Sequence, residues 1–411
     1  MLGTPLGEVL KRCPHKLEKS YKSKKVKNRL KVSVYTIIEI LVYILAFADI
    51  RNNAVKYGLI VIVGIFLTSK ISHGLLKHNR TFNILAGGFS VVSLLISFYF
   101  RGETARNPFF ANIVFGAIFI EFILTLEVVS EKKGIQHFLK NASICAVTIC
   151  IITDILAFTV GANSGIYLIG TKFQVIYQHM LAIVLYMIIN QGIIRNRKSI
   201  KYNRICLTLI GMFIVTILVS VQIDCSTGIV GTVVLFIFEW IISLKRNFFA
   251  RPIVFISAIL LGFAFMWGFE AILLNKQIIT LITVYLQRSI SLTGRTIIYT
   301  KMASIMNKHW MFGFGYGSTY EICYSEMGFA DTQNALMEWI MQIGIIGTIC
   351  LLVVLIFAFS KSVKIKNGKQ WTWLAAYIYT LIFIGTVEIT YTMYFFGILV
   401  LIYILGREED Y

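Results

Sequence analysis

Long runs of apolar, uncharged residues recur along the chain, and short clusters of charged residues separate them. A helix needs about 20 mostly apolar residues to cross the hydrocarbon core of a bilayer. The chain is 57% hydrophobic and 14% charged, whereas soluble domains are roughly 45–50% apolar and about 25% charged. It is therefore predicted to be an all-α, polytopic membrane protein with about twelve spans. The expected spans are residues 32–48, 54–69, 82–100, 109–129, 142–160, 175–194, 205–222, 226–244, 252–272, 335–358, 371–388 and 391–406.

The formal net charge of +19 would suggest nucleic-acid binding if the protein were soluble. In a membrane protein, the side on which the basic residues lie is more informative, because cytoplasmic loops are enriched in Lys and Arg. If the N-terminus is cytoplasmic, 29 of the 39 Lys and Arg residues fall in cytoplasmic segments. This distribution predicts that both termini are cytoplasmic, and it requires no nucleic acid.

The predicted spans divide the chain into five segments. A basic cytoplasmic tail covers residues 1–31, and it could bind anionic lipid or, less simply, nucleic acid. A nine-span region (32–272), a long outer loop (273–334), three further spans (335–406) and a short cytoplasmic tail (407–411) follow. No cleavable signal peptide is expected, because the first apolar run begins only after the basic tail and lacks a small-residue cleavage site.

The outer loop is the expected place for chemistry, because loops longer than about 15 residues are usually functional or disordered. Its apolar stretches predict amphipathic helices that lie on the membrane. Arg288 and Arg295 are seven residues apart, so a continuous helix would place both on one face. Guanidinium groups bind phosphate oxygens in a bidentate manner, so the pair fits a diphosphate. Gly294 could break that helix, and contact with lipid headgroups is the alternative.

Glycines alternate with aromatic residues from Gly313 to Gly317, a stretch that includes Gly315 and Tyr316. Glycine permits a tight turn and close approach of the backbone to a ligand. No Gly-Lys-Ser/Thr sequence follows, so the stretch is not a nucleotide-binding P-loop. The aromatic side chains could stack on sugar rings or pack at the membrane interface.

Four titratable residues of the loop could act as a general base toward a hydroxyl: His309, Glu321, Glu326 and Asp331. Each is also compatible with an ordinary solvated or interfacial position. The outer loops contain no histidine cluster, no His-Glu-x-x-His motif and no acidic run at metal-ligand spacing. We therefore expect neither a metal nor a cofactor.

Motifs in the C-terminal third resemble the O-antigen ligase and Wzy-type polysaccharide polymerase superfamily. The stretch from Ser291 to Tyr299 looks like the family's Thr/Ser-Gly-Arg followed by apolar and aromatic residues, and the stretch from His309 to Gly315 looks like its apolar-x-Gly-x-Gly turn. The family then shows His, a residue such as Asn, nine residues, Gly, two residues, and Gly, Thr or Tyr. Here nine residues separate Gln333-Asn334 from Gly344-Ile345-Ile346-Gly347, so the spacing matches in full.

Two positions depart from the family pattern. Gln333 replaces the histidine of the ligases, and glutamine cannot take up a proton. The stretch from Asp224 to Gly228 lies where the family often has Thr-x-Ser-Arg, and it lacks the arginine. The first departure favours a polymerase over a ligase.

The resemblance implies a fold similar to that of the C-type glycosyltransferases and a metal-independent transfer on the outer face of a bacterial plasma membrane. A sugar hydroxyl of one lipid-linked repeat unit would attack the anomeric carbon of another glycan held as an undecaprenyl diphosphate, to build a capsule, an exopolysaccharide or an O-antigen. The implied partners are the lipid-linked glycan donor and acceptor, membrane lipid, a flippase and a chain-length regulator.

The same resemblance directs the choice of site residues. Arg295, followed by Arg288, is expected to stabilise the departing diphosphate. Asp331 is the favoured base, and Gln333 is expected to hydrogen-bond a sugar or a phosphate. The remaining expected site residues are Glu321 and Glu326 as further bases, and Asn334, His309, Gly313, Gly315, Tyr316, Arg101, Arg106 and Lys172 as substrate contacts.

Two alternative functions remain. One is a ligase-type transferase that moves finished glycan to lipid A core or to protein, which Gln333 disfavours. The other is a flippase or exporter, which would use ionisable residues within the spans, such as Glu121, Asp154 and Glu239. These three are few and show no mirrored placement in two halves of the chain, and the cations cluster in loops, so transport is also disfavoured.

Overall fold

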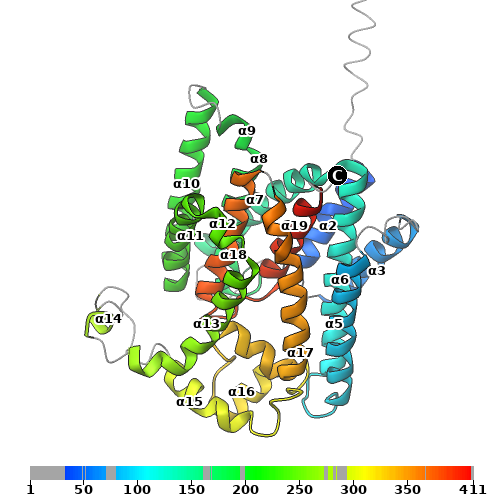
Figure 1. The fold of residues 1–411 in the computed structure, drawn as a ribbon, viewed down its shortest axis with the longest axis vertical. Coiled ribbons are helices and arrows are strands. Elements are labelled where there is room, and N and C mark those ends of the chain that lie inside the picture. Colours follow the sequence, from blue (N-terminus) through cyan, green and yellow to red (C-terminus); the bar gives the residue numbers. More distant parts are fainter. Residues whose placement is uncertain are drawn as a thin grey trace, which may run out of the picture. The chain divides into compact units, whose positions relative to one another are not determined.

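A computed structural model of the protein describes residues 33–48, 50, 52–70, 80–160, 167, 169–194, 200–272, 276–280, 284, 294–365 and 367–408. These residues form helices, turns and connecting segments, and no strand occurs among them. The predicted all-α fold is therefore confirmed (Figure 1). The packing and the sites lie within residues 38–411, which group as one compact unit. The basic tail and Arg288 lie outside the described residues.

Each predicted span overlaps a helix, and the helix ends differ from the prediction by up to seven residues. Eight of these helices, α3, α5 to α8, α10, α11 and α17, are long and apolar enough to cross a membrane, and α2, α13 and α19 contain shorter apolar stretches. The protein is thus a polytopic membrane protein. The helices are α2 (Val34–Phe47), α3 (Asn53–Lys70), α5 (Arg80–Tyr99), α6 (Pro108–Lys133), α7 (Ile135–Thr159), α8 (Lys172–Ile189), α10 (Ile200–Gln222), α11 (Ser226–Leu244), α13 (Pro252–Ile272), α17 (Ala335–Ser360), α18 (Gly368–Ile384) and α19 (Met393–Glu408), with the short α9 (Gln191–Ile194) and α12 (Arg246–Phe249) and a 3-10 turn (Lys361–Lys364) between them.

The described part of the predicted outer loop is largely helical. It contains α14 (Lys276–Thr280), α15 (Arg295–Ile305) and α16 (Thr319–Met327), and α15 and α16 lie at the end of the bundle where α17 begins (Figure 1). Gly294 precedes α15 with a left-handed φ of 87°, and a Cβ there would lie 2.2 Å from the Phe329 ring. Arg295 therefore stands at the start of a new helix.

Aromatic packing and interhelical hydrogen bonds hold the bundle together. Phe255 of α13 stacks on Phe359 of α17 with ring centroids 4.2 Å apart, and the Tyr377 hydroxyl of α18 donates to the Tyr177 carbonyl of α8 at 3.0 Å. In lipid, where no hydrophobic force drives helices together, such contacts supply most of the association energy.

The ionisable residues that the sequence places within spans lie at separate positions. Asp154 of α7 pairs with His179 of α8, with 2.9 Å between Oδ1 and Nε2. Glu121 of α6 is buried beside Gly64 of α3, and Glu239 is half-buried on α11. These three carboxylates do not form one pathway through the described helices.

The chain breaks the α17 hydrogen-bond ladder at Gly344, which has φ 65° and ψ −176°. The segment 310–315 fills the break by pairing its backbone with both sides of it. The four hydrogen bonds, donor first, are Phe314 to Met341 (2.9 Å), Gly315 to Gln342 (2.8 Å), Ile345 to Trp310 (2.8 Å) and Ile346 to Met311 (3.2 Å).

The close backbone contact explains why both motifs contain glycine. A Cβ on Gly344 would lie 2.2 Å from the Met311 carbonyl oxygen, and a Cβ on Gly313 would lie 2.6 Å from the Met341 carbonyl oxygen. Both glycines also have positive φ, which other L residues rarely adopt. The two glycine motifs thus face each other and fix the outer loop on α17.

We expect Gly344→Ala to lower the free energy of unfolding by about 3 kcal/mol, because the methyl group meets a backbone atom and the conformation is strained. The thermal unfolding midpoint in detergent measures this. Gly87→Ala is the control, since nothing lies within 4 Å of the added Cβ on α5. An unchanged midpoint for Gly344→Ala would contradict the backbone contact.

Candidate active site

A cavity of about 1200 Å³, here termed the large cavity, lies between α11, α13, α18 and the outer loop. Its α13 wall runs from Ile253 to Phe265, which corresponds to about 18 Å of helix. This wall is mostly apolar. The charged or amide residues that line the cavity are Lys172, Asp224, Arg295, Gln333 and Glu388, and they come from helix starts and connecting segments at the end of the bundle that carries the outer loop.

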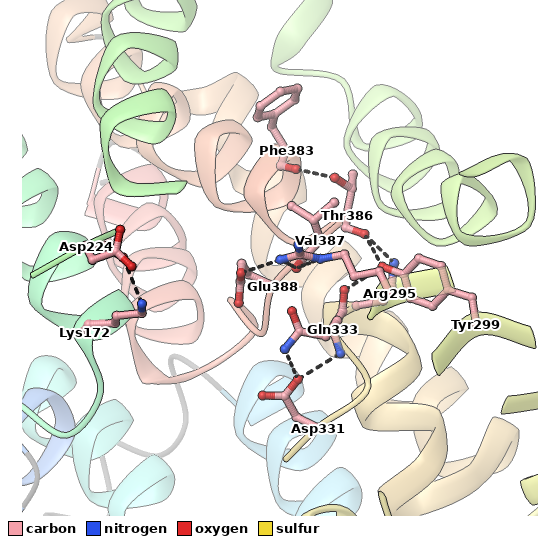
Figure 2. Close-up of polar contacts among 11 residues, drawn as sticks. Lys172, Asp224, Arg295, Tyr299, Asp331, Gln333, Phe383, Thr386, Val387 and Glu388 are labelled. Carbon is pink, nitrogen blue, oxygen red and sulfur yellow. Dashed lines mark hydrogen bonds and ion pairs between the residues drawn. The ribbon is translucent and has the colours of Figure 1, made fainter. Parts of the chain in front are cut away.

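Arg295 and Glu388 form a buried ion pair at this polar end, with 7% and 3% of their surfaces exposed. Arg295 Nη2 lies 2.7 Å from Glu388 Oε1, and Nε and Nη2 also donate to the Val387 carbonyl at 3.1 and 2.9 Å (Figure 2). A buried charge requires such partners, because desolvation is otherwise strongly unfavourable. The guanidinium group is thereby fixed at the cavity wall.

Lys172, the first residue of α8, places a second cation at the same end of the large cavity. Its Nζ donates to the backbone carbonyl of Asp224 at 2.9 Å, and Asp224 has a left-handed φ of 50°. In Figure 2 the Glu388 side chain lies between this pair and Arg295, and both cations attract its charge. The polar end thus presents two cations around one carboxylate.

Gln333 lines the large cavity in a strained conformation, with φ 52°. Its backbone N–H and its Nε2 donate to Asp331 Oδ1 at 3.0 and 2.7 Å, and its carbonyl accepts from the Tyr299 hydroxyl at 2.8 Å. Backbone strain of this kind persists where the surroundings impose it, and it is common at functional sites. The contacts hold the Gln333 amide against the carboxylate (Figure 2).

The titration of the two carboxyls near Arg295 is shifted upward. Burial raises the pKa of Glu388 to about 7, although the neighbouring Arg295 guanidinium acts in the opposite direction. Burial also raises the pKa of Asp331, against the hydrogen bonds from Gln333 and the charge of Arg295. The site therefore holds a carboxyl group that can exchange a proton near neutral pH.

Comparison with known protein families adds to this geometry. Residues 224–352 match the family model described as O-antigen ligase. The segment is similar to the O-antigen ligases. The match confirms the resemblance stated from the motifs, and it supports a glycan transferase of the O-antigen ligase and polymerase kind. No curated protein matches the chain.

Within the matched segment, Asn334 caps α17. Its Oδ1 accepts from the Met337 N–H at 3.1 Å, and its Nδ2 donates to the carbonyls of Gly262 and Thr386 at 3.0 and 3.2 Å. The side chain is buried and lines neither described cavity. Its amide thus joins three elements of the protein.

Glu321 and Glu326, the other predicted bases, lie on α16 away from the large cavity. Glu321 accepts from the backbone N–H groups of Ala105 and Arg106 at 2.9 and 3.3 Å, and Glu326 is exposed. Glu321 therefore fixes the segment between α5 and α6 to α16.

Arg101 and Arg106 are exposed on this α5–α6 segment and line neither described cavity. The Arg101 guanidinium lies 4.0 Å from the Phe98 ring centroid. Arg101, Arg106 and Lys172 were expected to complete the anion site. Of these three, Lys172 lines the same cavity as Arg295.

The glycine and aromatic turn packs mainly against α17 and its own neighbours. Gly313 and Gly315 pair with the α17 backbone, and His309 stacks on Phe314 with centroids 3.9 Å apart, outside both cavities. Tyr316 alone of this group lines a cavity, a second one of about 560 Å³.

Glu388 was not predicted as a site residue, because it falls at the end of a predicted span. The available signal was a single carboxylate at the boundary of an apolar run. Glu338, in the first turn of α17 and also overlooked, gave the same signal, because an ionisable residue within a span is a functional candidate by default.

We expect Asn334→Ala to lower the free energy of unfolding by about 1–2 kcal/mol through the lost helix cap. Thermal unfolding in detergent measures this, with Asn307→Ala at an exposed position as the control. Binding of undecaprenyl diphosphate is expected to persist in the folded variant. A selective loss of that binding at unchanged stability would instead assign Asn334 a contact with substrate.

Proposed function

We propose that the protein is a polysaccharide polymerase that joins undecaprenyl-diphosphate-linked repeat units on the outer face of a bacterial plasma membrane. The hydroxyl oxygen of the acceptor sugar forms a bond to the anomeric carbon of the donor. The bond between that carbon and the diphosphate oxygen breaks, the diphosphate leaves with the electron pair, and the hydroxyl proton passes to a base. Capsule, exopolysaccharide and O-antigen are the candidate products.

The observation that carries this proposal is a buried arginine at the polar end of a long apolar cavity. An apolar wall of about 18 Å accommodates part of a polyprenyl chain, and Arg295 and Lys172 lie where its diphosphate would be. Preorganised cations stabilise the negative charge that develops on a leaving diphosphate more than they stabilise the ground state. The cavity therefore fits a lipid-linked donor.

Glu388 is our candidate for the base in place of the predicted Asp331. It lines the large cavity, whereas Asp331 is absent from its wall and accepts two hydrogen bonds from Gln333. A pKa of about 7 suits a base that must be ionised at neutral pH and still bind a proton during the reaction. Asp331 acts through Gln333 and Glu388, as a positioning residue.

Two features favour the polymerase over the alternatives. Gln333 occupies the position of the ligase histidine and cannot take up a proton, although the matched family model is described by its ligases. For an exporter, ionisable residues of several spans should line a common cavity. Glu121, Asp154 and Glu239 line neither described cavity.

We expect Arg295→Lys to reduce polymer formation about 100-fold or more, because one ammonium group cannot replace the guanidinium contacts with Glu388 and the Val387 carbonyl and still donate to a phosphate oxygen. The assay reconstitutes the purified protein with its host's lipid-linked repeat units in EDTA and separates the glycans on a gel. Arg204→Lys, at an exposed position on α10, is the matched control.

The product pattern tests the function separately from the site. A ladder with one-repeat spacing in EDTA supports a metal-independent polymerase, and the same ladder from Arg295→Lys would remove Arg295 from the site. A single transfer of finished glycan to a lipid or protein acceptor would indicate a ligase. Movement of the unextended unit across sealed vesicles would indicate transport.

Glu388→Gln is expected to lower the polymerisation rate by about 10²–10⁴-fold, because glutamine cannot accept the proton. In the wild type, protonation below the pKa of about 7 removes the base, so the rate should fall about tenfold per pH unit on the acid side. The variant should lose this acid limb. A wild-type rate that does not change through neutral pH would exclude Glu388 as the base.

A further inference from the structure

The second cavity lies next to the large cavity, and two chain segments form a common wall between them. Lys172 lines the large cavity, whereas its neighbours Thr171 and Gln174 line the second. In the same way, Glu388 lines the large cavity and Ile389 lines the second. A ligand in the second cavity would thus lie on the other side of the wall from the Arg295–Glu388 pair.

A carboxylate and an amide form the polar part of the second cavity. Glu338 Oε1 accepts from Gln342 Nε2 at 2.8 Å, Glu338 Oε2 accepts from the Thr332 hydroxyl at 3.1 Å, and Gln342 Oε1 accepts from the Gly317 N–H at 3.2 Å. Glu338 Oε2 also accepts from the Thr332 N–H at 3.5 Å, whereas Oε1 keeps a second lone pair that can accept a further hydrogen bond. Hydroxyl groups of a ligand can therefore be bound here by acceptors whose positions are already fixed.

Glu338 is buried, with 8% of its surface exposed, and its hydrogen-bond partners Thr332 and Gln342 are neutral. Among the described residues, Glu338 forms no ion pair, and no Lys or Arg is among those that line the second cavity. Burial of a carboxyl group without a cation is unfavourable unless hydrogen bonds compensate for the lost water. Retention of Glu338 at a cavity wall indicates a ligand with hydroxyl or amide donors.

Aromatic rings form another part of the cavity wall. Tyr316 stacks on Phe115 with centroids 4.8 Å apart, and Trp339 lies 5.8 Å from Tyr316. The Trp339 indole N–H donates to the Tyr391 carbonyl at 2.9 Å, which fixes the ring. These residues line the second cavity and provide rigid apolar faces beside the polar group.

This combination matches a pyranose ring, which has apolar C–H faces and a rim of hydroxyl groups. A lipid tail would leave Glu338 unsolvated, and Glu338 would repel a diphosphate, since no cation is among the described residues that line the cavity. We infer that the second cavity binds a saccharide, with Glu338 and Gln342 at its hydroxyl groups and Trp339 and Tyr316 at its ring face. In the proposed polymerase, on which this assignment of the ligand rests, the saccharide belongs to a repeat unit.

The test separates the two cavities by using two probes with the full-length protein in detergent. The first probe is the host's free repeat-unit oligosaccharide, without lipid or phosphate, and the second is undecaprenyl diphosphate without sugar. Glu338→Gln should weaken binding of the oligosaccharide about tenfold and leave the affinity for undecaprenyl diphosphate within about twofold, as expected for one lost charged hydrogen bond. Arg295→Lys should do the reverse.

Glu121→Gln is the matched control, because Glu121 is as buried as Glu338 (9% exposed) and lines neither described cavity. Trp339→Phe, which retains an aromatic ring, is the second variant if Glu338→Gln does not fold. It should also weaken oligosaccharide binding. Saturation-transfer NMR then identifies the ring in contact: the non-reducing terminal sugar for an acceptor, or the reducing-end sugar for a donor.

The outcomes distinguish this inference from the proposed function. Absence of oligosaccharide binding, or binding that neither Glu338→Gln nor Trp339→Phe weakens, would overturn the saccharide site even if Arg295→Lys impairs diphosphate binding and polymerisation. Oligosaccharide binding that depends on Glu338 would support the site even if diphosphate binding proves independent of Arg295, in which case the proposed donor site fails.

Discussion

The Arg295–Glu388 ion pair is the interaction on which the site depends. It joins the first residue of α15 to the segment between α18 and α19, 93 positions later in the chain. Since both groups are buried, loss of either would leave an uncompensated charge, which is far more unfavourable than loss of a surface pair. The outer loop is therefore bound electrostatically to the C-terminal helices, and the polar end of the large cavity forms only where the two meet.

A second constraint fixes the loop from the other side. The segment 310–315 completes the hydrogen bonding of the broken α17 helix, and Asn334 caps the same helix while it binds Gly262 of α13. The start of α17 thus has a defined position relative to α13, which lines the large cavity, and it presents Glu338 and Trp339 to the second cavity. One helix start therefore relates the proposed donor site to the proposed saccharide site, which is what a reaction between two bound glycans requires.

The helices could be predicted from the sequence because each long apolar run by itself indicates a helix in a membrane. The sequence also selected Arg295, Lys172 and Gln333, which the structure brings to one cavity. It did not select Glu388 or Glu338, because a lone carboxylate carries no local pattern and its partner lies far away in the sequence or in a ligand. Gly313 and Gly315 were interpreted as ligand contacts because their partners also lie far away in the sequence. The partner of Gly313 is the α17 backbone around Gly344. Such pairings depend on tertiary structure and leave no periodicity.

In the proposed polymerase, the site differs from that of the ligases at Gln333 and keeps the transfer chemistry. The residue's φ of 52° keeps the strained turn at the start of α17, and its amide is held by Asp331 rather than directed to a proton. The proton-accepting capacity that glutamine lacks is available nearby, because burial raises the pKa values of both Asp331 and Glu388 beside Arg295. We infer that the turn positions substrate while the carboxyl at the cation handles the proton. The position of the base, more than the identity of residue 333, then decides which acceptor hydroxyl can react.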